Sequence, residues 1–103
     1  MDAYLCYGTA DIVYIESQSE YLKIHLKGNS PLMVLMSIKR MAELLPQDKF
    51  VRIHRSYIVN MSRVREIVRM KITMESDARL PIGESYKDDV QKYINERLMG
   101  KDQ

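Results

Sequence analysis

The stretch FVRIHRSYIVN, from Phe50 to Asn60, holds the side chains with the most evident chemistry in this chain. It places His54, Arg55 and Ser56, all polar, between two apolar runs that are rich in strand formers. A half-buried strand alternates polar with apolar residues, so three consecutive polar residues indicate a point where the chain leaves a sheet. The sequence therefore predicts that Arg55 is presented outward.

Nucleophilic catalysis is the first chemistry that histidine and serine suggest, because a hydrolase needs a nucleophile, a base and an orienting group. The two histidines are His25 and His54, and neither an HExxH pair nor the glycines of a nucleophile elbow accompany them. We interpret His25 as a solvated or cross-strand histidine and His54 as a buried one bonded to backbone beside a turn. The four glycines are scattered, so no phosphate-binding loop is formed. We expect no enzyme, no cofactor and no metal.

Charge gives a different indication, although the formal net charge is only +2. Between Lys49 and Met74 the only acid is Glu66, against seven basic residues: Lys49, Arg52, Arg55, Arg63, Arg65, Arg69 and Lys71. This distribution indicates one positive face, but a solvated strand surface would give the same counts. The single cysteine, Cys6, allows no disulfide framework. Without a signal peptide or a membrane-length apolar run, we expect a cytoplasmic protein.

Short strands are expected to form most of the chain. The predicted strands are an apolar run at 12–15, an alternating segment at 21–27, a third at 31–35, and the two halves of the 50–60 stretch. Apolar residues of one parity, Val64, Val68, Met70, Ile72 and Met74, extend the pattern from Arg63 to Glu75. A last short strand is expected at 79–82. We interpret most methionines, such as Met41, Met70 and Met74, as core residues.

Two helices interrupt this pattern. Apolar residues at helical spacing predict the first helix near 38–45, which Ser37 can cap and Pro46 ends. The second helix is predicted near 86–98, with a start at Ser85, Asp88 as the acid of a capping box and Gly100 as the stop. Short connections between strands favour antiparallel pairing. The predicted fold is mainly β, with small antiparallel sheets, one short helix and a C-terminal helix in a single domain, 1–103.

Four stretches in the same order resemble the LytTR-type DNA-binding domain of bacterial LytR/AlgR-family response regulators. They are DIVYIES with EYLKIHL, SIKRMAELLP, FVRIHRSYIVN and LPIGESYKDDV, and they cover about residues 11–90, with a C-terminal helix and tail at 91–103. The resemblance implies small antiparallel sheets that insert loops into successive major grooves. It also implies that His54, Arg55 and Ser56 form a DNA-facing loop, in which the Arg55 guanidinium can make two hydrogen bonds to guanine.

Two further contact regions follow from the same resemblance. One is the first loop, with Ser19, Glu20 and Tyr21, and the other follows the last strand, with Glu84, Ser85 and Lys87. Family members often carry a basic or neutral polar residue where this chain has the two glutamates. Either the glutamates accept hydrogen bonds from cytosine N4, or they stand aside while Ser19, Ser85 and Lys87 touch the DNA backbone.

The resemblance implies a domain excised from a longer response regulator, with a receiver domain in the parent chain. The expected partners are double-stranded promoter DNA and a second copy in a homodimer on that DNA, without a membrane. The alternative is a β-rich protein-interaction or sensory module that does not read DNA.

Overall fold

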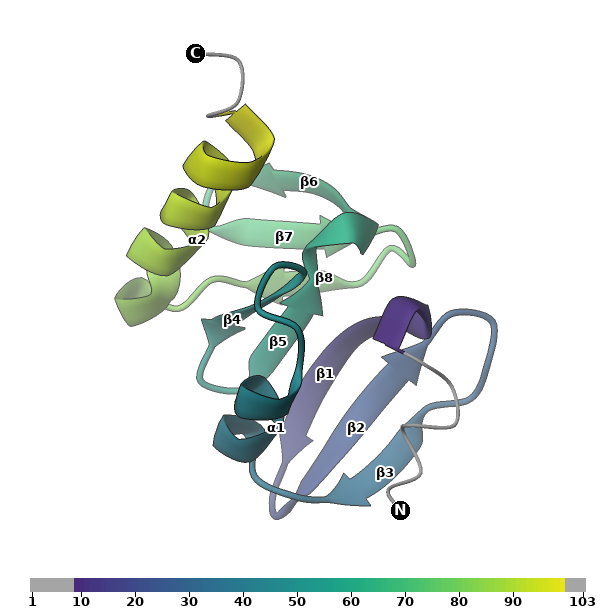
Figure 1. Cartoon of the computed structure of the whole chain (residues 1–103). Coiled ribbons are helices and arrows are strands. Elements are labelled where there is room, and N and C mark those ends of the chain that lie inside the picture. The colour runs from purple at the N-terminus through teal and green to yellow at the C-terminus, as the bar shows by residue number, and fades with distance from the viewer. Residues whose placement is uncertain (1–8, 100–103) are drawn as a thin grey trace.

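Two antiparallel sheets and two main helices make up the computed structural model, which describes residues 9–99 (Figure 1). The first sheet has five strands in the order β3-β2-β1-β5-β4, and the second has three in the order β6-β7-β8. Every strand pair is antiparallel. The predicted mainly β fold, with one short helix and a C-terminal helix, is confirmed. Cys6 lies outside the described residues.

The five-stranded sheet is built from residues 12–60. Its strands are β1 Ile12–Gln18, β2 Tyr21–Leu26, β3 Leu32–Leu35, β4 Phe50–His54 and β5 Tyr57–Asn60. Alternation in β2 buries Leu22, Ile24 and Leu26, as the sequence predicts. These side chains pack with Ile15, Ile58 and other apolar residues into a first core, which helix α1 (Ile38–Leu44) joins through Met41.

Helix α1 begins and ends close to the predicted residues. The Ser37 hydroxyl accepts a hydrogen bond from the Arg40 amide at 3.1 Å, which satisfies one of the free N–H groups of the first turn. The helix ends at Leu44, and Pro46 lies two residues further along the chain. The sequence prediction is confirmed here because the cap and the stop are both local signals.

The three-stranded sheet and the C-terminal helix enclose a second core. Its strands are β6 Val64–Val68, β7 Lys71–Met74 and β8 Arg79–Pro81, and helix α2 is Lys87–Tyr93. The 3₁₀ turn Glu84–Tyr86 precedes α2 and the π-helical segment Ile94–Met99 follows it. Two more 3₁₀ turns are Thr9–Asp11 and Met61–Arg63. Val90 of α2 belongs to this core together with Ile72 of β7, Leu80 of β8 and Ile53 of β4.

Asn60 joins the two sheets, because the chain passes from β5 to β6 through it. Its side chain is 1% exposed, and its Nδ2 donates to the Ile12 carbonyl at 2.9 Å. Its Oδ1 accepts from the amide and the hydroxyl of Ser62 at 3.0 Å and 2.6 Å. The bond to Ile12 therefore ties the chain crossing to β1, and the two bonds from Ser62 brace the crossing itself.

The stretch from Arg63 to Glu75 departs from the sequence pattern, which keeps one parity throughout. The chain instead reverses at Arg69 and Met70, both at positive φ (49° and 64°), and forms the β6–β7 hairpin. Met70 is 37% exposed, so its prediction as a core residue was wrong, whereas Met41 and Met74 are buried. Neither turn residue is glycine or asparagine, the usual signals of such a turn.

The start of α2 also differs from the prediction. Ser85 lies inside the 3₁₀ turn, and the residue at the helix N-cap is Tyr86, which makes no side-chain capping bond. The capping box expected from Ser85 and Asp88 is therefore absent from this helix start. The predicted stop at Gly100 lies outside the described residues. Tyr93 instead anchors the helix, because its hydroxyl donates to the Asp48 carbonyl at 2.6 Å.

Candidate nucleic-acid interface

Two hairpin turns lie next to each other at one end of the five-stranded sheet. Strand β1 pairs with β2 through the turn Ser19-Glu20, and it also pairs with β5, which begins after the turn Arg55-Ser56. The Ser17 amide donates to the Ser56 carbonyl at 2.9 Å, which joins the ends of the two hairpins. Ser17 and Ser56, which are 39 positions apart in sequence, are thus neighbours at this end.

The segment after β8 reaches the same end. The Gly83 amide donates to the Ile53 carbonyl at 2.7 Å, so the chain leading into α2 runs beside the last residues of β4. A Cβ at Gly83 would lie 3.1 Å from a Tyr86 ring carbon and 3.6 Å from the His54 Cα, so glycine permits this close approach. In Figure 1 the two turns and the start of α2 follow the same side of the molecule.

The β4–β5 turn has two residues rather than the three that the sequence predicts. His54 is the last residue of β4, and its Nδ1 accepts a hydrogen bond from the Ser56 amide at 3.1 Å. The sequence predicts this bond to backbone beside the turn, but the histidine is half-buried rather than buried. Arg55 is exposed at the tip, and Ser56 is half-buried. The turn therefore presents Arg55 outward, as predicted, from a histidine-braced hairpin.

The β1–β2 turn exposes the first candidate region. Ser19 has φ 57°, a left-handed conformation that suits the tight reversal, and both Ser19 and Glu20 are exposed. Tyr21 is the first residue of β2 and is 43% exposed. All three predicted residues of this loop are accessible from the end of the molecule.

The third candidate region carries an ion pair. The Lys87 Nζ lies 2.9 Å from the Glu84 Oε2, and both side chains are largely exposed. The hydrogen bond from Lys87 to Glu84, supported by the charge of the carboxylate, raises the pKa of Lys87. Ser85, between them, is exposed. In the free protein, Glu84 and Lys87 are therefore paired with each other.

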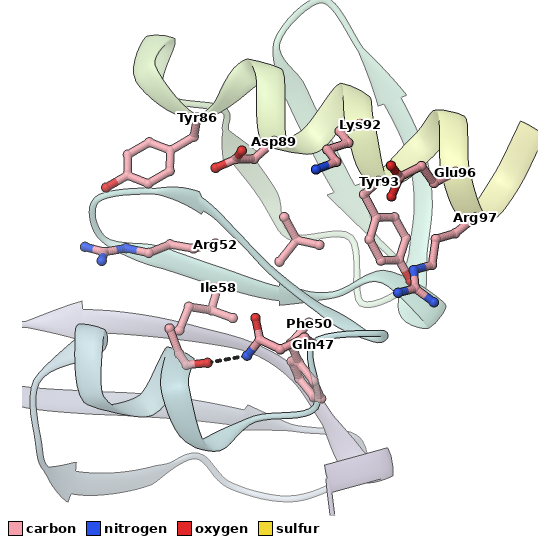
Figure 2. A pocket seen from close by; sticks show the side chains of 12 residues that line it. Gln47, Phe50, Arg52, Ile58, Tyr86, Asp89, Lys92, Tyr93, Glu96 and Arg97 are labelled. Atoms are coloured by element: carbon pink, nitrogen blue, oxygen red, sulfur yellow. Dashed lines mark hydrogen bonds between the residues drawn. The ribbon is translucent and has the colours of Figure 1, made fainter. Parts of the chain in front are cut away.

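Sequence reasoning missed two residues that connect these loops, Arg52 and Tyr86. Both line an open cleft of about 450 Å³ between α1, β4 and α2 (Figure 2). The cleft also contains Phe50, Tyr93 and Arg97, among other residues. Arg52 belonged to the basic segment and Tyr86 to an apolar helix stripe, and neither signal indicates a contact between the two.

His25 makes its contacts with residues of the neighbouring strand β1. The His25 Nε2 lies 3.1 Å from the Glu16 Oε1 on the neighbouring strand, and its ring stacks on Tyr14 with centroids 4.0 Å apart. It is therefore a cross-strand histidine, as predicted. Within residues 9–99, no group of three potential metal ligands comes together. No helix in the same range is long and apolar enough to cross a membrane.

Comparison with known families gives one match over most of the chain. The model of the LytTr DNA-binding domain matches residues 3–95. A solved LytTr DNA-binding domain from Bacillus cereus superposes with a TM-score of 0.75 at 24% identity, and 82% of each chain is covered. The similarity to the solved Bacillus cereus domain shows that the two chains share a fold.

Two curated proteins are similar in sequence. The CO-responsive transcriptional regulator RcoM of Rhodospirillum rubrum is 33% identical over 57 residues, which cover 55% of this chain and 24% of that protein. The sensory transduction protein LytT of Bacillus subtilis is 24% identical over 96 residues, which cover 84% of this chain and 38% of that protein. The chain therefore spans well under half the length of either relative.

Proposed function

The chain belongs to the LytTR family of DNA-binding domains, and from this membership we propose that it reads double-stranded promoter DNA sequence-specifically, with loops at one end of the molecule. The observation that carries the proposal is the adjacency of the turns Ser19-Glu20 and Arg55-Ser56 and the Gly83–Lys87 segment, which two backbone hydrogen bonds join. Three exposed segments far apart in sequence share one end of a fold whose family binds DNA. No enzymatic role is assigned, because the family is not enzymatic.

The width of the major groove suits the two hairpin turns. The groove is about 12 Å wide and admits a two-stranded β-ribbon, so a tight hairpin turn can enter it.

Arg55 is the proposed base-reading residue. It is exposed at the tip of the β4–β5 hairpin, with His54 and Ser56 bracing the turn from either side. A planar guanidinium matches the O6 and N7 acceptors of guanine with two hydrogen bonds, which fixes both base identity and loop orientation. His54 and Ser56 then lie at the groove edge beside it.

The two flanking regions are proposed to position the domain. Ser19, Glu20 and Tyr21 offer hydroxyl groups and a carboxylate from the first hairpin, and Ser85 and Lys87 offer a hydroxyl and an ammonium group beside α2. Hydroxyl and ammonium groups typically bond phosphate oxygens. For Glu84, standing aside is the stronger proposal, because its carboxylate is already paired with Lys87.

The wider biological role follows from the relatives and is part of the proposal. We infer an output domain of a longer cytoplasmic response regulator in a two-component system, in which a receiver domain controls transcription. A homodimer of that parent on promoter DNA would raise the effective concentration of each domain, so the isolated domain should bind more weakly than the parent. The names of the two curated relatives, a transcriptional regulator and a sensory transduction protein, support this role.

Selection from a pool of random duplexes, followed by affinity measurement at several salt concentrations, tests the function. A DNA reader should enrich a defined site, and its affinity should fall steeply with salt because phosphate contacts release counterions. Failure to bind any duplex, or binding that ignores salt, would favour a protein-interaction or sensory module.

A further inference from the structure

Arg52 holds the base of the β4–β5 turn through two carbonyl groups. Its Nη2 donates to the Arg55 carbonyl at 2.8 Å, and its Nε donates to the His54 carbonyl at 3.4 Å. A guanidinium carries its donors in one rigid plane, so a single side chain can serve two successive carbonyls. The backbone of the residue that presents the Arg55 side chain is thereby tied to the strand that precedes it.

The same guanidinium lies over an aromatic ring from another element. The Arg52 Cζ is 5.5 Å from the centroid of the Tyr86 ring, within the range of a cation–π contact. Tyr86 lies at the start of α2, and its side chain packs against Gly83. Figure 2 shows Arg52 of β4 and Tyr86, the last residue of the 3₁₀ turn before α2, extending side by side.

These contacts connect the β4–β5 turn to the segment that precedes α2 in two ways. Arg52 binds the turn that carries Arg55 and stacks on Tyr86, while the Gly83 amide returns to the Ile53 carbonyl at 2.7 Å. The turn at Arg55 and the segment at Glu84–Lys87 therefore cannot move apart without breaking the Arg52 contacts. Arg52 therefore contacts both proposed DNA-contacting segments, alongside the backbone hydrogen bond between Gly83 and Ile53.

We propose that Arg52 is a positioning residue, which clamps the β4–β5 turn to the start of α2 and sets the spacing of the two loops for DNA. This inference rests on the proposed DNA-reading function. A pre-formed arrangement lowers the cost of ordering the loops on binding and holds Arg55 in the orientation that a bidentate contact requires. Tyr86 is the second half of the clamp.

Direct contact of Arg52 with a phosphate is the competing explanation. A phosphate contact depends chiefly on charge, so Arg52→Lys would retain most of the affinity, and Arg52→Met would make the log–log salt dependence shallower by about 0.9. A clamp depends on the planar guanidinium, so Arg52→Lys would lose almost as much DNA affinity as Arg52→Met. The salt slope would stay unchanged in both variants. The two explanations thus differ in both readouts.

The binding experiment compares five single variants on the selected duplex. We expect Arg52→Met and Arg52→Lys to bind about tenfold more weakly with an unchanged salt slope, which is the scale of losing hydrogen bonds from a charged donor. Tyr86→Leu should weaken binding in the same direction, and Tyr86→Phe should bind as wild type. The matched control is Arg65→Met, which removes a cation paired with Asp77 at the far end of the second sheet.

A double-mutant cycle measures whether Arg52 and Tyr86 act together. In a clamp, Arg52→Met combined with Tyr86→Leu should lose little more affinity than Arg52→Met alone, because the first change already breaks the contact. Additive losses, or a shallower salt slope in Arg52→Met, would overturn the clamp. Retention of affinity in Arg52→Lys would do the same.

Amide hydrogen exchange tests the clamp without DNA. In Arg52→Met, two hydrogen-bonded amides at the turn should exchange about fivefold faster than in wild type, with the exchange of β2 unchanged. They are the Ser56 amide, which donates to the His54 Nδ1, and the Ser17 amide, which donates to the Ser56 carbonyl. This readout separates the two proposals: if no duplex binds but exchange accelerates, DNA reading fails and the clamp stands. Unchanged exchange at the turn would overturn the clamp whatever the protein binds.

Discussion

Replacing Arg55 with alanine removes the proposed base-reading side chain while leaving the fold intact. Arg55 is exposed, and the contact it makes within the hairpin is through its backbone carbonyl, which accepts from Arg52. Alanine retains that carbonyl and its hydrogen bond. The melting temperature of the variant should therefore equal that of the wild type, so a change in affinity can be assigned to the lost side chain.

The size of the loss follows from the contact proposed. A bidentate pair with guanine contributes roughly 1–3 kcal/mol of discrimination, which corresponds to about 5- to 150-fold in affinity. The preference at one base pair should relax, because only that guanine loses its partner. Arg55→Lys keeps the charge but loses the planar fork, so it should fall between wild type and alanine on the selected site.

The assay is titration of both variants against the selected duplex and its single-base-pair substitutions. A phosphate contact would instead give a nearly uniform loss across all sequences. Full affinity with unaltered base preference in Arg55→Ala would refute the reasoning that assigns base reading to this turn.

The remaining predictions concern the third loop, the chain crossing and the strained hairpin. Glu84→Gln should free Lys87 and raise the affinity for all duplexes, with a log–log salt slope steeper by about 0.9 in titrations. Weaker binding only at sites with one cytosine would show that Glu84 reads that base. Asn60→Ala should cost about 3 kcal/mol in urea unfolding, because buried partners are left unpaired; a loss under about 1 kcal/mol would contradict this. Replacing Arg69-Met70 with Asn-Gly should stabilise the fold by about 1–2 kcal/mol in the same assay, since both positions have positive φ; no gain would show that the turn is unstrained.

The fold could largely be predicted where the signals were local. Alternation in β2, the Ser37 cap and Pro46 each act within a few residues, and the structure follows all three. The β6–β7 turn could not be predicted, because Arg69 and Met70 keep the apolar parity and lack the residues that favour a left-handed turn. The free energy gained from pairing β6 with β7 exceeds the cost of positive φ at the turn. The sequence does not show which of these two free energies is larger.

The candidate site could be predicted only in part, because its three segments are brought together by hydrogen bonds between residues distant in sequence. The resemblance named three separate segments, and the outward position of Arg55 followed from polarity alone. That the segments meet depends on the bonds from Ser17 to Ser56 and from Gly83 to Ile53, which link residues distant in sequence. The Arg52–Tyr86 contact has no sequence signature, since either residue is equally plausible on a solvated or buried face.

A two-dimensional NMR titration with the selected duplex tests most directly whether the three loops at one end contact DNA. We expect the amide shifts to concentrate at 19–21, 54–56 and 84–87 and to leave the opposite turn, at Ser76 and Asp77, unchanged. Shifts that concentrate at that opposite turn or on exposed Met33 and Leu35 of β3, with the three loops silent, would contradict it.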